Sequence, residues 1–294
     1  MAEYLAYLNL VYSVAIIFCQ LVVLTTMSRI LIVHYVWPSR LTSKGMSVTI
    51  IIYLAINIFD CLVSVPFQTY LLVSFQADKT SFDIYLLYWL GFWSQNCLIA
   101  GPVAIFCLTL ERYLAVTLSL RYDRKFKCLV IWLQMTMLFV IYSLSCFTYL
   151  LELPLDLAKV SQCGIFSCLL TKYRNLPQLG TKVIFGLLNI SLSVLFFRNI
   201  RKNMLNIKNR AVWITLVLEV CLNSLPTFIG FSFNAVTGTS FAIYAGQYAI
   251  FLSNLDSALC GIFYTFILMP SEKRVEVPVT SLAHNRKNNL STYN

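Results

Sequence analysis

Seven long apolar runs divide this sequence, and they constrain its fold more than any other feature. The runs cover residues 8–33, 46–75, 84–116, 128–153, 177–200, 211–233 and 240–268. A helix needs about 20 mostly apolar residues to cross a bilayer, where only helices and closed barrels satisfy their backbone polar groups. We therefore predict an all-α membrane protein, with a seven-transmembrane helix bundle over residues 1–270 and a disordered cytoplasmic tail at 271–294.

The composition agrees with lipid as the main solvent. Hydrophobic residues make up 59% of the chain and charged residues only 12%, whereas soluble domains are about half apolar and about a quarter charged. A formal charge of +10 would suggest nucleic acid as the partner of a soluble protein. Here the Lys and Arg residues lie between the apolar runs, so we expect the lipid bilayer, and no nucleic acid, as a partner.

The positions of the basic residues predict the orientation of the chain. With the N-terminus outside, seventeen of the 22 Lys and Arg residues fall on the cytoplasmic side. The five on the outer side are Lys79, Lys159, Lys172, Arg174 and Lys182, the last near the start of the fifth run. Positive charge accumulates in cytoplasmic loops. We therefore predict an outside N-terminus and a cytoplasmic C-terminus, which requires an odd number of spans.

A charged motif stands at the predicted cytoplasmic end of the third run. Residues 110–116 read LERYLAV, with the acid-arginine-tyrosine group at Glu111, Arg112 and Tyr113, and LRY follows at 120–122. This block resembles the (D/E)RY signature of rhodopsin-like (class A) G-protein-coupled receptors, with Ser119 in place of the usual proline.

Three other runs carry parts of the same family's motifs. In the seventh run, LDSALCGIFY at 255–264 resembles L-N-S-x-x-N-P-x-x-Y, with Asp256 at the first Asn and Tyr264 at the Tyr. In the second run, Asp60 falls on the family's buried aspartate. In the sixth run, Pro226 matches the C-W-x-P proline, although Asn223 and Ser224 replace Cys and Trp.

The sequence also departs from the family pattern. The outer end of the third helix has Leu87 where the family's disulfide cysteine stands, and Cys163 and Cys168 either pair with each other or stay free. These departures indicate a divergent, chemoreceptor-like branch, of the general kind of the nematode serpentine and fish odorant receptors.

The resemblance implies a receptor in the plasma membrane that activates a heterotrimeric G protein when a small, apolar or weakly polar ligand binds from outside. Its G-protein coupling and activation switch would comprise Glu111, Arg112, Tyr113 and Tyr264. Glu111 would hold Arg112 at rest. Pro226 and Gly261 are either simple kinks or hinges.

Ionisable groups inside membrane helices are costly and are candidates for function. A buried polar network is expected from Asp60, Glu219, Asp256 and Ser257. Two close carboxylates cannot both stay ionised cheaply, so Asp60 and Asp256 would either share a proton or bind a metal cation, for which the family uses sodium. Gly101 replaces one of the family's sodium ligands. No cofactor other than a sodium ion is expected.

The resemblance also implies an apolar ligand pocket between the outer halves of the helices. The positions carried over are Ser94, Gln95, Leu98, Thr227, Phe228, Phe231, Ile250 and Asn254. Aminergic receptors have an aspartate at Ser94 and opsins a Schiff-base lysine at Asn254, so neither chemistry is expected. Each of these residues is alternatively an ordinary packing residue.

Other membrane functions fit less well. A transporter or channel is the main alternative, but the paired halves with broken helices that typify transporters are not apparent. An enzyme is not expected, because the HExxH motif of zinc proteases and the nucleophile motifs of serine proteases are missing. A taste-type receptor would lack the ERY and LRY block.

Overall fold

The computed structural model describes residues 2–37, 46–74, 83–118, 124–155, 166–170, 176–200, 207–237 and 241–269. Every regular element in these ranges is a helix. The predicted tail at 271–294, Cys163 and the side chain of Cys168 lie outside the described residues.

Among the described residues, seven helical segments contain a stretch long and apolar enough to cross a membrane, and these stretches have 21 to 34 residues. This finding confirms the predicted number of spans and supports a multi-pass membrane protein. The segments are α1 (Ala2–Val36), α2 (Val48–Val73), α3 with α4 (Ile84–Leu98 and Ala100–Thr117), α5 (Arg124–Leu150), α8 (Leu176–Ile200), α9 with η3 and α10 (Ile207–Leu218, Glu219–Ser224 and Leu225–Thr237), and α12 (Tyr248–Leu268). Two short helices, α7 (Phe166–Leu169) and α11 (Ala242–Ala245), lie between them in the chain.

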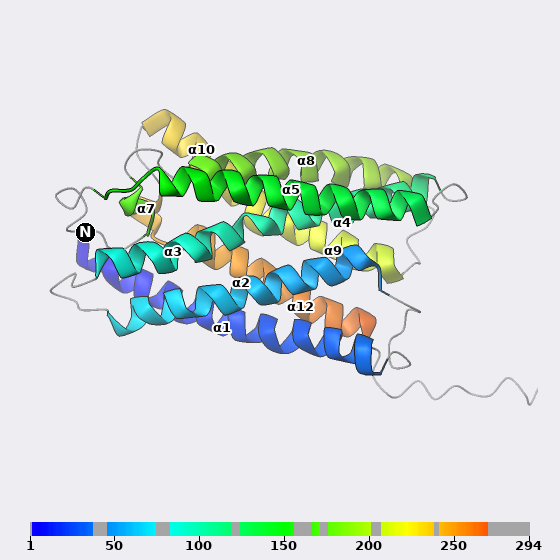
Figure 1. Ribbon diagram of the computed structural model, residues 1–294, viewed down its shortest axis with the longest axis horizontal. Coiled ribbons are helices and arrows are strands. Elements are labelled where there is room, and N and C mark those ends of the chain that lie inside the picture. Colours follow the sequence, from blue (N-terminus) through cyan, green and yellow to red (C-terminus); the bar gives the residue numbers. More distant parts are fainter. Residues whose placement is uncertain are drawn as a thin grey trace, which may run out of the picture.

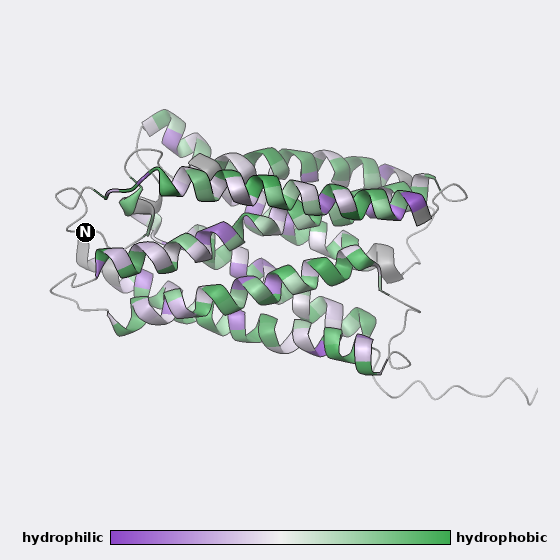
Figure 2. Ribbon diagram, in the orientation of Figure 1, coloured by the Kyte–Doolittle hydropathy of each residue, from purple (hydrophilic) through white to green (hydrophobic). Residues whose placement is uncertain are grey.

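The long helices run side by side as an elongated bundle (Figure 1). Helix α1 packs against α2 and α12, while α4 contacts α2, α5, α8 and α9 and so lies near the centre. Hydrophobic residues cover much of each long helix (Figure 2). Large apolar side chains also face outward, such as Phe18, Phe59, Trp132 and Phe139. A water-soluble monomer rarely exposes apolar surface on this scale, so the outer face of the bundle is suited to lipid.

Two apolar clusters fill the interior. The larger contains Val23, Met27, Tyr53, Leu108 and Tyr264, so it joins α1, α2, α4 and α12. The smaller is rich in aromatic residues, lies toward the end where α3 begins, and contains Phe67, Tyr88, Phe92, Tyr149 and Phe166. Many polar side chains are buried in the interior as well, and they are described below.

Two helix breaks were not predicted from the apolar runs. The third span is divided at Ile99, and the seventh long helix begins at Tyr248 rather than near residue 240. Between α11 and α12, Gly246 has a φ of 61°, a left-handed conformation that glycine adopts readily and that commonly ends helices. A Cβ at Gly246 would also collide with Oδ1 of Asn9 in α1, and that oxygen accepts a hydrogen bond from the Gln247 N–H at 3.1 Å.

Candidate functional site

The motif residues Glu111 and Arg112 are buried at the end of the bundle where α2 begins. A guanidinium nitrogen of Arg112 lies 3.5 Å from Oε1 of Glu111, and the two side chains are 10% and 7% exposed. Thr49, in the first turn of α2, donates a hydrogen bond to Oε2 of Glu111. The carboxylate is therefore held on both sides, by a neighbouring charge and by a hydroxyl of another helix.

Helix α2 begins in a way that positions Thr49. Ser47 is its N-cap and accepts a hydrogen bond from the Ile50 N–H at 3.4 Å. The Ser47 hydroxyl also lies 2.8 Å from that of Thr49. Serine is among the preferred N-cap residues because its oxygen satisfies an otherwise unpaired N–H. The cap thus fixes the start of α2 and brings Thr49 to Glu111.

Tyr264 of α12 lies close to the same arginine. Its hydroxyl is 2.6 Å from Oγ1 of Thr215 in α9, and it interacts electrostatically with Arg112. The Nε atom of Arg112 is buried without a hydrogen-bond partner among the described residues. Three of the four predicted switch residues therefore converge, whereas Tyr113 is half-buried and packs beside the larger apolar cluster. Thr49 and Thr215 were missed, because no sequence motif distinguishes them from other threonines.

A second polar group occupies the middle of the bundle. The side chains of Asp256 of α12 and Glu219 of η3 lie close enough to interact with each other. The Asn223 amide donates to Oε2 of Glu219 at 3.1 Å, and the Cys260 thiol approaches Oδ1 of Asp256 at 3.8 Å.

The π-helical turn η3 explains why Glu219 reaches this position. The Leu225 N–H donates to the carbonyl of Val220, five residues earlier, and Pro226 lacks a backbone N–H with which to continue an α-helical ladder. The wider turn makes Glu219, Asn223 and Ser224 all buried. Such π-turns occur frequently at functional sites.

Asp60 belongs to a separate chain of hydrogen bonds. The Ser64 hydroxyl lies 3.3 Å from Oδ1 of Asp60 and 2.9 Å from the hydroxyl of Ser94 in α3. Ser257 instead donates to Oδ1 of Asn57 at 2.7 Å. By the hydrogen bonds among the described residues, the predicted network residues therefore fall into three sets, two of which interact electrostatically with Lys182.

The predicted sodium ion would lie between Asp60 and Asp256, whose surroundings differ. Asp256 is paired with Glu219, and Asp60 interacts with Ser64 and the positive charge of Lys182. Within the described ranges, no three His, Cys, Asp or Glu side chains are grouped as metal ligands. The structure thus gives the two aspartates different neighbours, Glu219 for Asp256 and Lys182 for Asp60, while a cation or a shared proton between them stays a prediction.

Lys182 is the main functional candidate that the sequence analysis missed. It was counted among the basic residues at the outer surface, but it lies within α8 and is only 7% exposed. It interacts electrostatically with Glu219 and Asp60. Its place inside the fifth apolar run was the one signal that could have revealed it.

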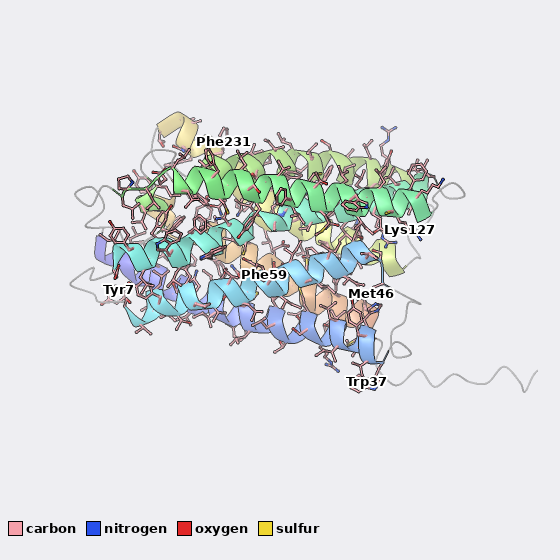
Figure 3. The ribbon with its side chains drawn as sticks, viewed as in Figure 1. Tyr7, Trp37, Met46, Phe59, Lys127 and Phe231 are labelled. Carbon is pink, nitrogen blue, oxygen red and sulfur yellow. The ribbon has the colours of Figure 1, made fainter. Side chains whose placement is uncertain are left out.

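The predicted ligand-binding residues are mostly interior. Ser94, Gln95, Leu98, Thr227 and Asn254 are buried, and Phe228 and Ile250 are partly buried. The Asn254 amide donates to the Ile250 carbonyl within its own helix at 2.9 Å. Phe231 is 45% exposed on α10 (Figure 3), so it lies apart from the buried members of this set.

Gly261 lies where α12 approaches α1 closely. A Cβ there would collide with Oγ1 of Thr26 and would stand 3.4 Å from Cγ of Met27. The glycine is thus required for helix packing, while its role as a hinge stays a prediction. Pro226 follows the π-turn, as described above.

No protein-family model matches the chain, and no curated protein matches its sequence.

Proposed function

We propose that this protein is a G-protein-coupled receptor of the plasma membrane that binds a small, apolar or weakly polar molecule from outside. The supporting observation is the buried Glu111–Arg112 pair, tied to α2 by Thr49 and lying beside Tyr264. A guanidinium carries five donors and a permanent charge, and here its Nε has no partner among the described residues. Such a group can exchange an internal partner for one on another protein.

The proposed mechanism is a shift between two arrangements of the bundle. At rest, Glu111 lies beside Arg112, and Tyr264 interacts with it electrostatically. A ligand between the outer halves of the helices favours a second arrangement in which Arg112 turns to the G protein. The ligand shifts this equilibrium only by its difference in affinity for the two arrangements. The π-turn before Pro226 is a natural place for the sixth span to change shape, because π-turns interrupt the regular helix ladder.

The experiment that tests this function measures G-protein activation in cells expressing a panel of heterotrimeric G proteins, with a broad library of volatile and lipophilic compounds. Arg112→Ala is expected to abolish the response at equal surface level. Arg198→Ala is a charge-matched control near the same end of the bundle, because Arg198 lies in the last turn of α8. Equal signalling by the Arg112→Ala variant, or no response to any G protein and compound, contradicts the proposal.

A transporter or channel is the second candidate, and the charged group formed by Asp60, Lys182 and Glu219 supports it. Ionisable residues inside membrane spans often mark ion pathways. Reconstitution in liposomes distinguishes the two functions. A receptor leaves ion flux unchanged, whereas a channel or transporter gives flux that is lost in Lys182→Met and Asp60→Asn.

A further inference from the structure

Helix α5 is the least buried of the seven spans that the structure describes. In its apolar window 17% of the residues are buried, against 33% to 67% in the other six spans. Its main contacts with the bundle are with α3, α4 and α8. The opposite face of α5 is therefore open to whatever surrounds the protein, and its side chains determine what it can bind.

The open face carries one continuous stripe of exposed side chains. Successive residues of an α-helix are about 100° apart around its axis, so positions 125, 129, 132, 136, 139, 143 and 147 lie within about 40° of one line. We call this set the α5 stripe, and all of its members are exposed: Lys125, Leu129, Trp132, Thr136, Phe139, Ser143 and Phe147. The buried residues Val130, Gln134 and Ser145 lie on the other side of α5.

The stripe begins with a positive charge and continues without any charge. Lys125 is exposed at the same end of the bundle as Arg112, and exposed Arg198 in the last turn of α8 lies at that end too (Figure 1). Among the described side chains the one exposed acid is Asp83, which caps α3 at the opposite end. The sequence from 121 to 127 has four basic residues and one acidic residue. The surroundings of Lys125 therefore attract an anion.

The spacing along the stripe matches one leaflet of a bilayer. At 1.5 Å per residue, Trp132 lies about 10 Å and Phe139 about 21 Å further along α5 than Lys125. Half of a bilayer with its headgroups is about 20–22 Å thick. With Lys125 at the headgroups, Trp132, which is 68% exposed, lies near the ester groups, where tryptophan is favoured. Phe139 then lies near the ends of the acyl chains.

A second copy of the chain fits this stripe less well than a lipid. Two chains inserted in the same orientation pair about a two-fold axis, and such a contact places the same patch of each chain opposite itself. The two Lys125 ammonium groups would then face each other, and α5 contains no Asp or Glu to neutralise them. An anionic lipid supplies the missing negative charge.

We propose that the α5 stripe binds one anionic phospholipid. Lys125 donates charge-assisted hydrogen bonds to the headgroup, the indole N–H of Trp132 donates to an ester oxygen, and an acyl chain packs along Phe139. In the predicted orientation this end of the bundle faces the cytoplasmic leaflet, where anionic lipids are concentrated. The inference does not depend on the proposed receptor function, because any membrane protein with this stripe would bind the same lipid.

The test measures how strongly lipids with brominated acyl chains quench the fluorescence of Trp132 in the purified full-length protein, reconstituted in phosphatidylcholine bilayers. Brominated phosphatidylserine and brominated phosphatidylcholine are compared at the same small share of the bilayer. The sequence has five tryptophans, so the signal of Trp132 is the difference between the chain and its Trp132→Phe variant. We expect phosphatidylserine to occupy the stripe about fivefold more readily than phosphatidylcholine, as for one basic side chain near a membrane surface.

Two lysine variants locate the interaction on the stripe. Lys125→Gln is expected to remove the preference for phosphatidylserine while both lipids still quench Trp132. Lys127→Gln is the matched control, because Lys127 is also exposed at this end of α5 (Figure 3) but lies about 200° around the helix from Lys125, on the side of buried Gln134. This variant removes the same charge and is expected to keep the preference.

The inference is overturned if the two brominated lipids quench Trp132 equally in the unchanged chain, which would show ordinary solvation by lipid. It is also overturned if Lys125→Gln keeps the preference, or if Lys127→Gln removes it to the same extent. If neither lipid quenches Trp132, lipid does not reach the stripe and the inference is wrong. Crosslinking of two chains through Ser143→Cys, beyond that of the unchanged chain, would then identify a second copy as the occupant.

Discussion

Thr49 in the first turn of α2 donates its hydroxyl hydrogen to the carboxylate of Glu111 in α4. The two residues are 62 positions apart in the sequence, so the bond ties together two helices at one end of the bundle. It also occupies the acid that lies beside Arg112. A single hydroxyl thereby links the start of one helix to the charge that we propose as the activation switch.

Removal of this hydroxyl is expected to release the switch. Thr49→Val keeps the shape of the side chain but loses a hydrogen bond to a charged group, which contributes about 1.5–3 kcal/mol. We expect a rise in ligand-independent G-protein activation, measured as nucleotide exchange at equal surface level. Thr109→Val is the matched control, because this buried threonine bonds only to Ile105 in its own helix. Equal basal activity of both variants would contradict a restraining role of Thr49.

The Tyr264–Thr215 bond joins α12 to α9 beside Arg112. Tyr264→Phe and Thr215→Val each remove one hydroxyl of a buried pair 2.6 Å apart. We expect each variant to lose about 1 kcal/mol of stability and the double variant to lose less than the sum, because partners in contact are not additive. Thermal unfolding in detergent provides the measurement. Strictly additive losses would show that the two hydroxyls act independently.

The close approach at Gly261 predicts a steric effect. Gly261→Ala places a methyl group against Thr26 and is expected to cost about 1–3 kcal/mol, the usual range for overpacking. Thr26→Ala in the same chain should recover part of that loss. Gly101→Ala serves as the control, because no neighbouring side-chain atom lies within 4 Å of its Cβ position. If all three variants unfold at the same temperature, α1 and α12 do not pack as described.

The carboxyl pair of Glu219 and Asp256 is expected to behave as one unit. Glu219→Gln supplies a permanent N–H donor to Asp256, so it should be tolerated better than Glu219→Leu, which leaves Asp256 unpaired in the interior. We expect a difference of about 1–3 kcal/mol between the two variants in unfolding experiments. When Asp256→Leu is also present, the difference in free energy of unfolding between Glu219→Gln and Glu219→Leu should become smaller. An unchanged difference would exclude direct pairing.

The orientation of the chain can be tested without any ligand. An epitope at residue 2 is expected to be stained on intact cells, and an epitope at residue 294 only after permeabilisation. The prediction depends on the unequal distribution of basic residues. The reverse pattern would put Arg112 on the outer side of the membrane and would rule out coupling to a cytoplasmic G protein.

The sequence was sufficient for the number and place of the helices, because a long apolar run has few alternatives in a bilayer. It was less informative about partners inside the bundle. Asp60 and Asp256 were identified as buried acids, but the partner of Asp256 depends on the π-turn that carries Glu219 inward. Lys182 was counted with the basic residues of the outer side, because its neighbours in the sequence do not reveal that its face of α8 meets Asp60 and Glu219. These contacts depend on how each helix is rotated about its own axis, and a nearly continuous apolar run does not specify that rotation.

The length of α1 sets the thickness of the membrane that suits this protein. Tyr7 and Trp37 lie near its opposite ends (Figure 3), 48% and 49% exposed. At 1.5 Å per residue they are about 45 Å apart, which is close to the full thickness of a bilayer with its headgroups, about 40–45 Å. Aromatic rings favour the interface between lipid and water. In a thinner bilayer both rings can stay at the interfaces only if α1 tilts. Because α1 packs along α2 and α12, these helices would have to tilt with it. The length of the lipid chains therefore affects the tilt of the whole bundle relative to the membrane normal.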